Sequence, residues 1–470
     1  MCSGSAAASG APPRLVIAGL SGESGKTLVS LALLLEARRR RVPVRAFKKG
    51  PDYIDAAWLA WASGAPARNL DTYLMGFESA AQSFIRNAVH GGWNVVEGNR
   101  GLYDGVDAQG SHSTGALAKM LYAPVVLVLN ATKMTRTAAA LVLGCQTLDP
   151  EVWIAAVILN QVAGRRHESI LRDSIETSCS IPVLGAIPRG AGTLLPSRHL
   201  GLVTPAEHPD SSELARSLLD LTRGHIDWDR LHEISCRAPR LMAPSLAEAG
   251  VTSAAGARIG YIKDEAFTFY YLENLDALRT AGAELVPFSA LSSIALPEEI
   301  DGLYIGGGFP ETHARKLAAN TSLLGSIRHA AREGMPIYAE CGGLMLLARG
   351  LVWQGARHEM AGVLPFDVEV CCSPQGHGYV ELCVDTANVL FPRGLRLKGH
   401  EFHYSRLVFD ENCPPPTACA VLRGTGCFER RDGIVVDNVW ASYTHLHATA
   451  TPEWAPAFLA AALRFARVAA

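Results

Sequence analysis

The segment LVIAGLSGESGKTLVSLALLLEARR, residues 15–39, places an apolar run, a turn rich in glycine and serine, and an apolar helical pattern in immediate succession. The turn contains Gly22, Gly25, Lys26 and Thr27, and Leu20 stands where the usual phosphate-loop pattern has its first glycine. Such a turn between a strand and a helix exposes backbone N–H groups to polyphosphate. The lysine then reaches the β- and γ-phosphates and the threonine hydroxyl binds Mg²⁺. The segment therefore predicts an ATP site.

Around this segment, short β-rich runs alternate with stretches rich in alanine and leucine, which is typical of a doubly wound α/β fold with a parallel sheet. The sequence predicts strands at 15–19, 43–48, 93–97, 124–130, 153–160, 182–187, 258–262, 284–288, 302–305, 336–340 and, with a more antiparallel character, 379–383. The 470 residues divide into a disordered tail at 1–13, a P-loop domain at 14–220, a linker at 221–256 and a second α/β domain at 257–470.

Composition excludes several classes of protein. Lys+Arg 43 against Asp+Glu 45 gives a net charge of -2, so no nucleic-acid footprint is visible. No run reaches the ~18 apolar residues of a membrane span, and the first 13 residues lack the features of a signal or transit peptide. The 11 cysteines are scattered without a CxxC pair, which indicates reduced thiols and a cytoplasmic location.

Acidic residues follow the second and third predicted strands. Residues 48–55 read KKGPDYID, and residues 97–105 read EGNRGLYDG. Because ligands of open parallel sheets bind at the carboxyl ends of the strands, Thr27, Asp52 and Glu97 are expected to converge on one Mg²⁺ ion. The alternative is that Asp52 and Asp55 cap a helix and that Asp104 serves a turn.

A candidate nucleophile follows the strand predicted at 336–340. Cys341, Gly342 and Gly343 come next, before an apolar helical run at 344–348. A strand–cysteine–helix elbow presents the thiol at a helix N-terminus, where its pKa is expected to fall and where backbone N–H groups can hold an oxyanion. His445 and His447 are the candidate bases, and their spacing in an extended segment puts both on one face. A buried structural cysteine is the alternative.

From residue 14 to about 468 the chain resembles the cobyrinate a,c-diamide synthase family of glutamine-dependent amidotransferases. Several motifs carry the resemblance in the same order along the chain. They are GKT at 25–27, FK at 47–48, GPDYID at 50–55, RNLD at 68–71, EG at 97–98, GLYDG at 101–105, GGGFPE at 306–311, AECGGLM at 339–345 and GHEFHYS at 399–405.

The resemblance implies a P-loop domain like dethiobiotin synthetase, followed by a class I glutamine amidotransferase domain. ATP and L-glutamine are then co-substrates, Mg²⁺ is the cofactor, and the acceptors are the a and c acetate carboxylates of a tetrapyrrole. Glutamine is attacked by the thiol, ATP phosphorylates a carboxylate, and ammonia displaces phosphate. By the same resemblance the catalytic residues are Cys341, His445, Gly342 and Gly308, the ATP and Mg²⁺ residues include Asp52, Glu97 and Asp104, and the acceptor lies against Tyr53 and Ile54.

Departures from the family pattern leave the acceptor open. Lys49 and Arg100 stand where relatives have neutral residues, and His447 stands where many class I amidotransferases have a glutamate. The two cations, with the segments at 375–379 and 443–445, resemble the branch that amidates siroheme-type rings, so siroheme, sirohydrochlorin, cobyrinate and hydrogenobyrinate all remain candidates. A homodimer is among the oligomeric states left open. The alternatives are a partition-type ATPase switch with a binding domain, and a biotin-pathway synthetase, which would lack the C-terminal half.

Overall fold

The computed structural model describes residues 12–190, 202–208, 210–241 and 256–469. Its contacts divide the chain into two compact units, Met1–Leu246 and Ala247–Ala470. Of the tail expected at 1–13, all but Pro12 and Pro13 lies outside the described residues.

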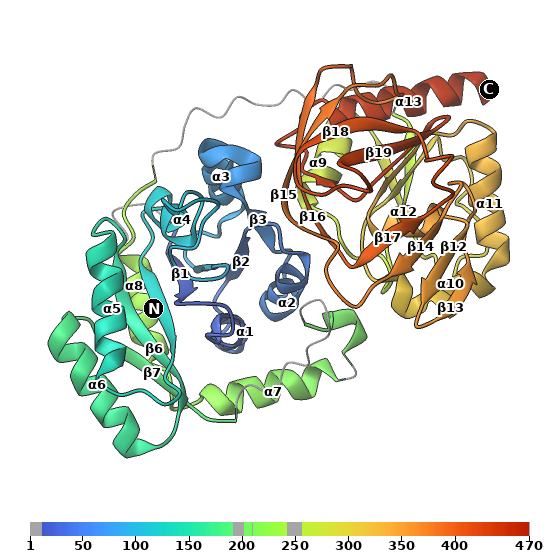
Figure 1. Ribbon diagram of the computed structural model, residues 1–470. Helices are drawn as coiled ribbons and strands as arrows, with labels where there is room; N and C mark the ends of the chain where they lie inside the picture. Colours follow the sequence, from blue (N-terminus) through green and yellow to red (C-terminus); the bar gives the residue numbers. More distant parts are fainter. Residues whose placement is uncertain (1–11, 191–201, 209, 242–255, 470) are drawn as a thin grey trace. The chain divides into compact units, whose positions relative to one another are not determined.

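A seven-stranded parallel sheet forms the centre of the first unit (Figure 1), in the order β3-β2-β4-β1-β5-β6-β7. Every strand predicted for this unit is present within one or two residues of its expected bounds, whereas no pattern predicts β3. The strands are β1 (Arg14–Gly19), β2 (Val44–Lys49), β3 (Arg68–Leu70), β4 (Trp93–Glu97), β5 (Val125–Asn130), β6 (Ile154–Val162) and β7 (Val183–Pro188).

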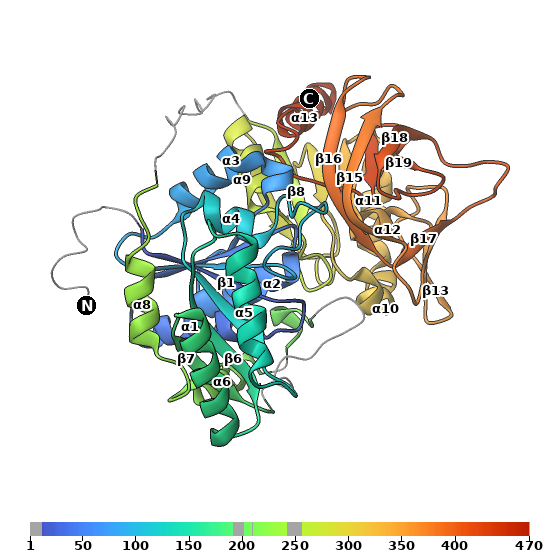
Figure 2. The ribbon, with the colours of Figure 1, turned by 60° about the vertical axis from the view of Figure 1, so that its left-hand side comes forward.

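Helices cover the sheet because its central strands are apolar on both faces. α3, α4, α5 and α6 contribute Phe84, Leu117, Val142 and Leu171 to one buried cluster with the sheet, and α5 and α6 lie side by side (Figure 2). α1 packs against α2 and α7. The helices are α1 (Lys26–Arg39), α2 (Tyr53–Ser63), α3 (Thr72–Asn87), α4 (Thr114–Met120), α5 (Thr137–Leu148), α6 (Arg165–Cys179), the 3₁₀ turn η3 (Pro205–Glu207), α7 (Ser211–Thr222) and α8 (Trp228–Cys236).

Part of the segment expected to be a linker at 221–256 belongs to the first unit. Ile226 forms a bridge with Gly185 of β7, and α8 buries Trp228, Leu231 and Ile234. Burial of these apolar side chains gives the segment a packed structure, and their spacing of three residues is a helical signal that sequence reasoning overlooked. The boundary between the units falls at residues 246 and 247, within the same segment.

The second unit is built on a ten-stranded sheet in the order β21-β16-β15-β18-β19-β20-β11-β10-β8-β9. From β20 to β9 the pairing is parallel, and from β21 to β20 it is antiparallel. The strands are β8 (Arg258–Ile262), β9 (Glu284–Phe288), β10 (Gly302–Ile305), β11 (Ile337–Glu340), β15 (Gly376–Val384), β16 (Arg396–His403), β18 (Thr417–Arg423), β19 (Arg431–Val436), β20 (Val439–Ser442) and β21 (His445–Leu446).

A smaller sheet and a set of helices complete this unit. The sheet has the order β13-β12-β14-β17, with strands β12 (Gly350–Trp353), β13 (Ala356–Glu359), β14 (Asp367–Val370) and β17 (Ser405–Val408). The helices are α9 (Leu272–Ala281), η4 (Pro310–His313), α10 (Ala314–Ala319), α11 (Thr321–Arg332), α12 (Gly342–Leu347) and α13 (Trp454–Ala469). All strands predicted for this unit are present, so the predicted α/β class is confirmed in both units. In the described ranges, no helix combines the length and apolar character needed to cross a membrane.

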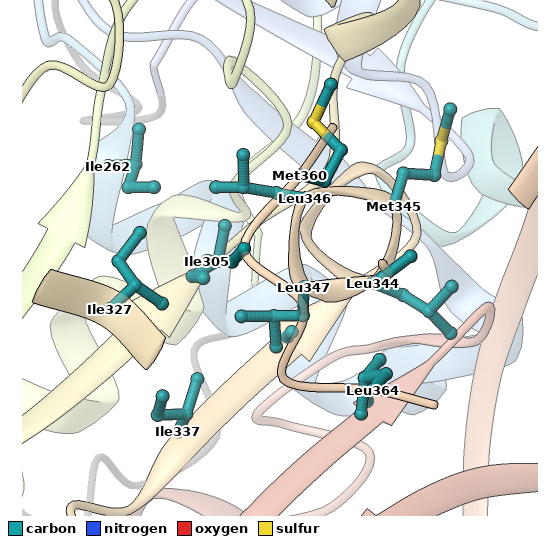
Figure 3. Close-up of a cluster of buried hydrophobic side chains, with 14 of the residues drawn as sticks. Ile262, Ile305, Ile327, Ile337, Leu344, Met345, Leu346, Leu347, Met360 and Leu364 are labelled. Atoms are coloured by element: carbon teal, nitrogen blue, oxygen red, sulfur yellow. The ribbon is translucent and has the colours of Figure 1, made fainter. Parts of the chain in front are cut away.

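Apolar packing fixes α12, the helix after the cysteine. Leu344, Met345, Leu346 and Leu347 are all buried. Figure 3 shows Leu346 and Leu347 on the side of the helix that faces the labelled isoleucines, whereas Leu344 and Met345 extend from the other side. A helix of six residues with such a buried surface is held by tertiary contacts rather than by its own hydrogen bonds.

Candidate active sites

The glycine-rich loop connects β1 to α1 as the sequence predicts. Gly25 caps the helix with φ 97 and ψ 18, a left-handed conformation that favours glycine. A Cβ atom at Gly25 would also clash with the Asn160 amide, whose Nδ2 donates a hydrogen bond to the Ser24 carbonyl at 3.1 Å. The end of β6 therefore fixes the loop, while Gly22 lies exposed with open space around its Cα.

Lys26, the first residue of α1, folds back over the loop. Its Nζ donates a hydrogen bond to the Ser21 carbonyl at 2.7 Å, and the side chain is buried. Burial lowers the pKa of Lys26, and the nearby charge of Lys48 lowers it further. The lysine thus stands over the same backbone that would hold phosphate.

Two predicted site residues meet at the carboxyl end of the sheet, together with a lysine that sequence reasoning overlooked. The Thr27 hydroxyl donates to Glu97 Oε1 at 3.0 Å, and Lys48 Nζ lies 2.8 Å from the same oxygen. Lys48 also contacts Asp55 at 2.6 Å, and its own side chain is almost fully buried. Burial alone would lower the pKa of Lys48, but Asp55 and Glu97 outweigh it and hold that pKa above its usual value.

Asp52 caps α2, as the alternative interpretation predicts. Its carboxylate accepts a hydrogen bond from the Asp55 backbone N–H at 2.8 Å. Burial and the neighbouring Asp55 raise the pKa of Asp52 to about 7. Within the described ranges no group of three or more His, Cys, Asp or Glu side chains is arranged to hold a metal ion. The structure brings Thr27 and Glu97 into hydrogen-bond contact, whereas the Asp52 carboxylate is bonded to the first turn of α2.

The segment after β4 folds against the phosphate loop. Leu102 N–H donates to the Gly19 carbonyl at 2.7 Å, and a Cβ at Gly101 would lie 2.7 Å from the Leu20 carbonyl oxygen. Asp104 Oδ2 accepts from Gly101 N–H at 2.8 Å, so Asp104 serves the turn as the alternative interpretation predicts. Its charge nevertheless reaches Lys26 and raises the pKa of that lysine slightly against the lowering effect of burial.

The residues predicted to contact the acceptor lie at the start of α2 and beside it. Tyr53 and Ile54 are the first two residues of α2, with Ile54 buried. Lys49 is buried, whereas Arg100 is exposed and has φ 51. Burial lowers the pKa of Lys49, and the charges of Lys48 and Arg100 lower it further. The positive charge of exposed Arg100 therefore reaches the buried Lys49 side chain and disfavours its charged form.

The predicted cysteine elbow is present in the second unit. Cys341 has φ 48 and ψ −98, a strained backbone for a residue with a side chain. Its N–H donates to the Ser442 carbonyl at 2.7 Å, which joins the elbow to β20. A Cβ at Gly343 would clash with the Ile305 carbonyl, so the turn needs a residue without a side chain there. The strain marks Cys341 as a residue held in place by its surroundings.

The expectation that the Cys341 pKa is lowered is wrong for this structure. Burial raises the pKa of the thiol to about 12, and the carboxylates of Glu311, Glu340 and Asp432 add to the increase. The Gly342 N–H lowers the pKa, but this effect is smaller than that of burial. A thiolate at this position therefore requires a cation beside it.

A run of glycines connects the elbow with His445. A Cβ at Gly342 would lie 3.0 Å from the Gly308 nitrogen, so the predicted oxyanion donors are adjacent. A Cβ at Gly307 would lie 2.5 Å from Cε1 and 3.4 Å from Nε2 of His445. The structure thus gathers Cys341, Gly342, Gly308 and His445 around the loop at 306–308.

His447 lies in a different part of the same histidine cluster. The rings of His445 and His400 stack with centroids 4.9 Å apart. The His447 ring centroid lies 4.6 Å from that of Tyr271, and its Nε2 lies 3.9 Å from Glu273. Both His445 and His447 act on the pKa of His400, which burial already holds well below its usual value.

Sequence reasoning missed Lys48, Asn160 and Glu340. Each ends a predicted strand or stands close to its end, and each is buried. Charged or amide side chains in strands that are otherwise apolar were the available signal, since such residues are rarely buried unless they are paired.

Two family models match the chain. The CobQ/CobB/MinD/ParA nucleotide binding domain matches residues 15–202, and the CobB/CobQ-like glutamine amidotransferase domain matches residues 258–453. The matches coincide with the P-loop sheet of the first unit and with the elbow-bearing sheet of the second. They confirm the predicted combination of domains.

Proteins named cobyrinate a,c-diamide synthase match over nearly the whole chain. The protein from Magnetococcus marinus is 43% identical over 453 residues, 95% of this chain and 96% of the relative. That from Dehalococcoides mccartyi is 39% identical, covering 95% of this chain and 97% of the relative. That from Archaeoglobus fulgidus is 38% identical, covering 96% and 98%.

Replacing Asp52 with Asn separates its capping role from a role in nucleotide binding. Asn caps helices about as well as Asp, so Asp52→Asn should leave α2 intact. We expect the affinity for ATP with Mg²⁺, measured by titration calorimetry, to fall about tenfold or more. Unchanged affinity would restrict Asp52 to the helix cap. Asp210→Asn, at the cap of α7, is the matched control.

The same variant has a pH signature. The pKa of Asp52 in the folded protein is about 7, above its usual value of 3.8. Its contribution to stability is therefore fully present below pH 3.8 and is lost as the pH rises through 7. Unfolding by denaturant should show this loss for the wild type and a smaller loss for Asp52→Asn.

Proposed function

The chain belongs to the cobyrinate a,c-diamide synthase family, and from this membership we propose that it converts the a and c acetate carboxylates of a cobyrinate-type tetrapyrrole into amides. The proposal rests on the relatives named cobyrinate a,c-diamide synthase, which match over nearly the whole chain. The chain is an ATP-dependent, glutamine-hydrolysing ligase. The amidotransferase domain disfavours a partition-type ATPase switch, which has no use for the cysteine elbow.

In the second unit, Cys341 is the proposed nucleophile toward the glutamine side-chain amide. Its sulfur forms a bond to the amide carbon, and His445 passes the thiol proton to the departing nitrogen, so that ammonia leaves and a glutamyl thioester remains. Gly308 and Gly342 N–H groups support the oxyanion of the tetrahedral intermediate. Water then hydrolyses the thioester to glutamate and restores the thiol. The adjacency of these groups around the loop at 306–308 supports this assignment.

In the first unit, the proposed step is phosphorylation of an acetate carboxylate by ATP. The loop N–H groups, with Lys26, hold the phosphates and stabilise the charge on the transferred group. The acyl phosphate is then attacked by ammonia, which forms the amide and releases phosphate. Two observations support this arrangement. Lys26 Nζ is hydrogen-bonded to the phosphate loop, and the turn that contains Asp104 packs against the same loop.

Thr27 and Glu97 fit a magnesium ion. Their oxygens lie 3.0 Å apart beside the phosphate loop, and oxygen donors with substrate phosphates are the ligands that Mg²⁺ prefers. The ion would neutralise charge on the β- and γ-phosphates. Lys48 holds Glu97 and Asp55 near the loop by ion pairs, so the negative charge around that position is already partly balanced.

Siroheme-type rings remain a second candidate acceptor because of Lys49 and Arg100. A buried cation with a lowered pKa gains more from a carboxylate partner than an exposed one, and Lys49 is in this situation. The names of the relatives favour cobyrinate, and the two cations favour a ring with more carboxylates.

Cys341→Ser should lose glutamine-dependent amidation and keep amidation with high concentrations of ammonium, because the thiol serves only to release nitrogen. Product formation followed by mass spectrometry tests this. Lys26→Ala is the reciprocal control, which should lose amidation with either nitrogen source while keeping basal glutaminase activity. If ammonium did not rescue Cys341→Ser, Cys341 would have to act in the ligase step or in folding.

Lys49→Val with Arg100→Met tests the choice of acceptor. If these cations pair with ring carboxylates, each contact contributes on the order of 1–3 kcal/mol. The double variant should then raise KM for a siroheme-type substrate far more than KM for ATP or glutamine, and cobyrinate should be less affected. Lys49→Val alone should account for most of the change because Arg100 is exposed. Arg41→Met, at an exposed arginine with φ 58, is the control.

An unchanged ratio of kcat/KM between the two macrocycles would show that Lys49 and Arg100 do not select the acceptor. The names of the relatives would then be the remaining guide to the ring.

A further inference from the structure

The carboxylate of Glu340 is fully buried beside the cysteine elbow, and the proposed chemistry gives it no role. Glu340 ends β11 and directly precedes Cys341. Its Oε1 accepts hydrogen bonds from the Tyr338 hydroxyl at 2.8 Å and the Leu446 N–H at 2.9 Å. Its Oε2 accepts from the Tyr304 hydroxyl at 3.1 Å and lies 3.8 Å from Nδ1 of His445.

Three neutral donors do not balance a buried negative charge. Buried carboxylates are ordinarily paired with a cation as well as hydrogen-bonded, because an uncompensated charge in the interior is costly. In the described part of the chain, the ionisable base beside Glu340 is His445. A hydrogen bond from the protonated imidazole would supply the positive charge that the tyrosine hydroxyls cannot give to the Glu340 carboxylate.

The two edges of the His445 ring face different groups. Nδ1 faces Glu340 Oε2 at 3.8 Å. Cε1 and Nε2 face Gly307, and the carbonyl carbon of Gly307 would lie 3.4 Å from a Cβ at Gly342. The ring is thus oriented with Nδ1 toward the carboxylate and Nε2 toward the loop that borders the elbow. A separation of 3.8 Å exceeds a hydrogen bond, and such contacts at active sites often tighten only when substrate binds.

We propose that Glu340 is the positioning residue of the glutaminase centre: its carboxylate accepts a hydrogen bond from the Nδ1–H of His445, fixes the tautomer whose unprotonated Nε2 faces the glycine loop beside Cys341, and balances the imidazolium. The Nδ1 proton stays on His445 throughout, and Nε2 takes and returns the proton of the thiol. This inference rests on the proposed roles of Cys341 and His445.

Glu340 thereby supplies the carboxylate that is missing at position 447, where this chain has a histidine. The sequence offers His447 two residues after the base, but its ring packs on Tyr271 and its Nε2 faces Glu273. The carboxylate instead comes from the residue before the nucleophile. One strand end therefore presents the nucleophile and holds the base.

Other charged groups in the cluster set the electrostatic background. His400 stacks on His445, accepts or donates a hydrogen bond with the Tyr271 hydroxyl at 3.0 Å, and is influenced by His447 and His377. On the opposite side, Glu311 and Asp432 act on the Cys341 thiol.

Glu340→Gln tests the proposal because Gln keeps the size of the side chain and removes the charge. Glutaminase kcat/KM should fall on the order of 10²-fold, whereas amidation with free ammonium should stay within about twofold of wild type, as expected of a folded protein with an intact ligase site. A purely structural role would lower both activities together, and this outcome would overturn the proposal.

The pH profile gives a readout that a structural role would not change. The charge of Glu340 favours the protonated form of His445, so its removal makes that form less favourable. Because His445 takes the thiol proton in its neutral form, its protonation sets the acidic limb of the glutaminase profile, and this limb should move to lower pH in Glu340→Gln. Tyr304→Phe removes a hydrogen bond from the oxygen facing His445, concentrates charge there, and should move the same limb to higher pH. An unchanged limb in Tyr304→Phe overturns the proposal even if Glu340→Gln does not fold.

Two controls keep the outcomes distinct. Glu401→Gln alters another buried glutamate of this unit, which accepts from Thr425 and Gly426 N–H groups and lies 3.7 Å from His403, and should leave the acidic limb in place. If Cys341→Ser retains glutaminase activity, the proposed function fails and this inference fails with it. If Cys341→Ser is inactive while Glu340→Gln keeps the wild-type rate and profile, the positioning role alone fails.

Discussion

A carboxylate buried at the end of a parallel strand must find partners, and both candidate sites are organised around one. Glu97 ends β4 and Glu340 ends β11, and both are fully buried. Leaving either charge uncompensated would cost several kcal/mol. Glu97 is paired with Lys48 and hydrogen-bonded to Thr27. Glu340 is hydrogen-bonded by two tyrosines and a backbone N–H, and it lies beside His445. These requirements determine which side chains gather at each sheet edge.

The two units meet this constraint with different chemistry. In the first, a lysine from the adjacent strand neutralises the glutamate, because the register of β2 and β4 places Lys48 opposite Glu97. A fixed positive charge suits a site that also has to bind phosphate. In the second, the neighbour is an imidazole, whose charge can change near neutral pH. A neighbour that gains and loses a proton suits a site that activates a thiol, and the raised pKa of Cys341 makes such a neighbour necessary.

Much of the fold could be predicted from the sequence because buried parallel strands read as continuous apolar runs. The strands at 93–97, 258–262, 284–288 and 302–305 have the predicted bounds. The three-residue strand β3 was too short to leave a pattern, whereas Trp228, Leu231 and Ile234 of α8 have a helical spacing that sequence reasoning overlooked. The loop and the elbow could be predicted since glycine spacing reports backbone geometry directly. The partners of buried charges could not, because Lys48 and Glu340 meet their partners only through sheet register and tertiary packing. Likewise, the burial of Cys341 and its nearness to Glu311 and Asp432, which raise its pKa, come from tertiary packing.

The central claim is that nitrogen released from glutamine is placed on a tetrapyrrole carboxylate activated by ATP. The most direct measurement is mass spectrometry of cobyrinate after incubation with the protein, ATP, Mg²⁺ and glutamine labelled with ¹⁵N in its side-chain amide. The account predicts a diamide that carries ¹⁵N at both new amides, formed with hydrolysis of one ATP for each amide. Unmodified cobyrinate, with ATP and glutamine both consumed, would contradict it.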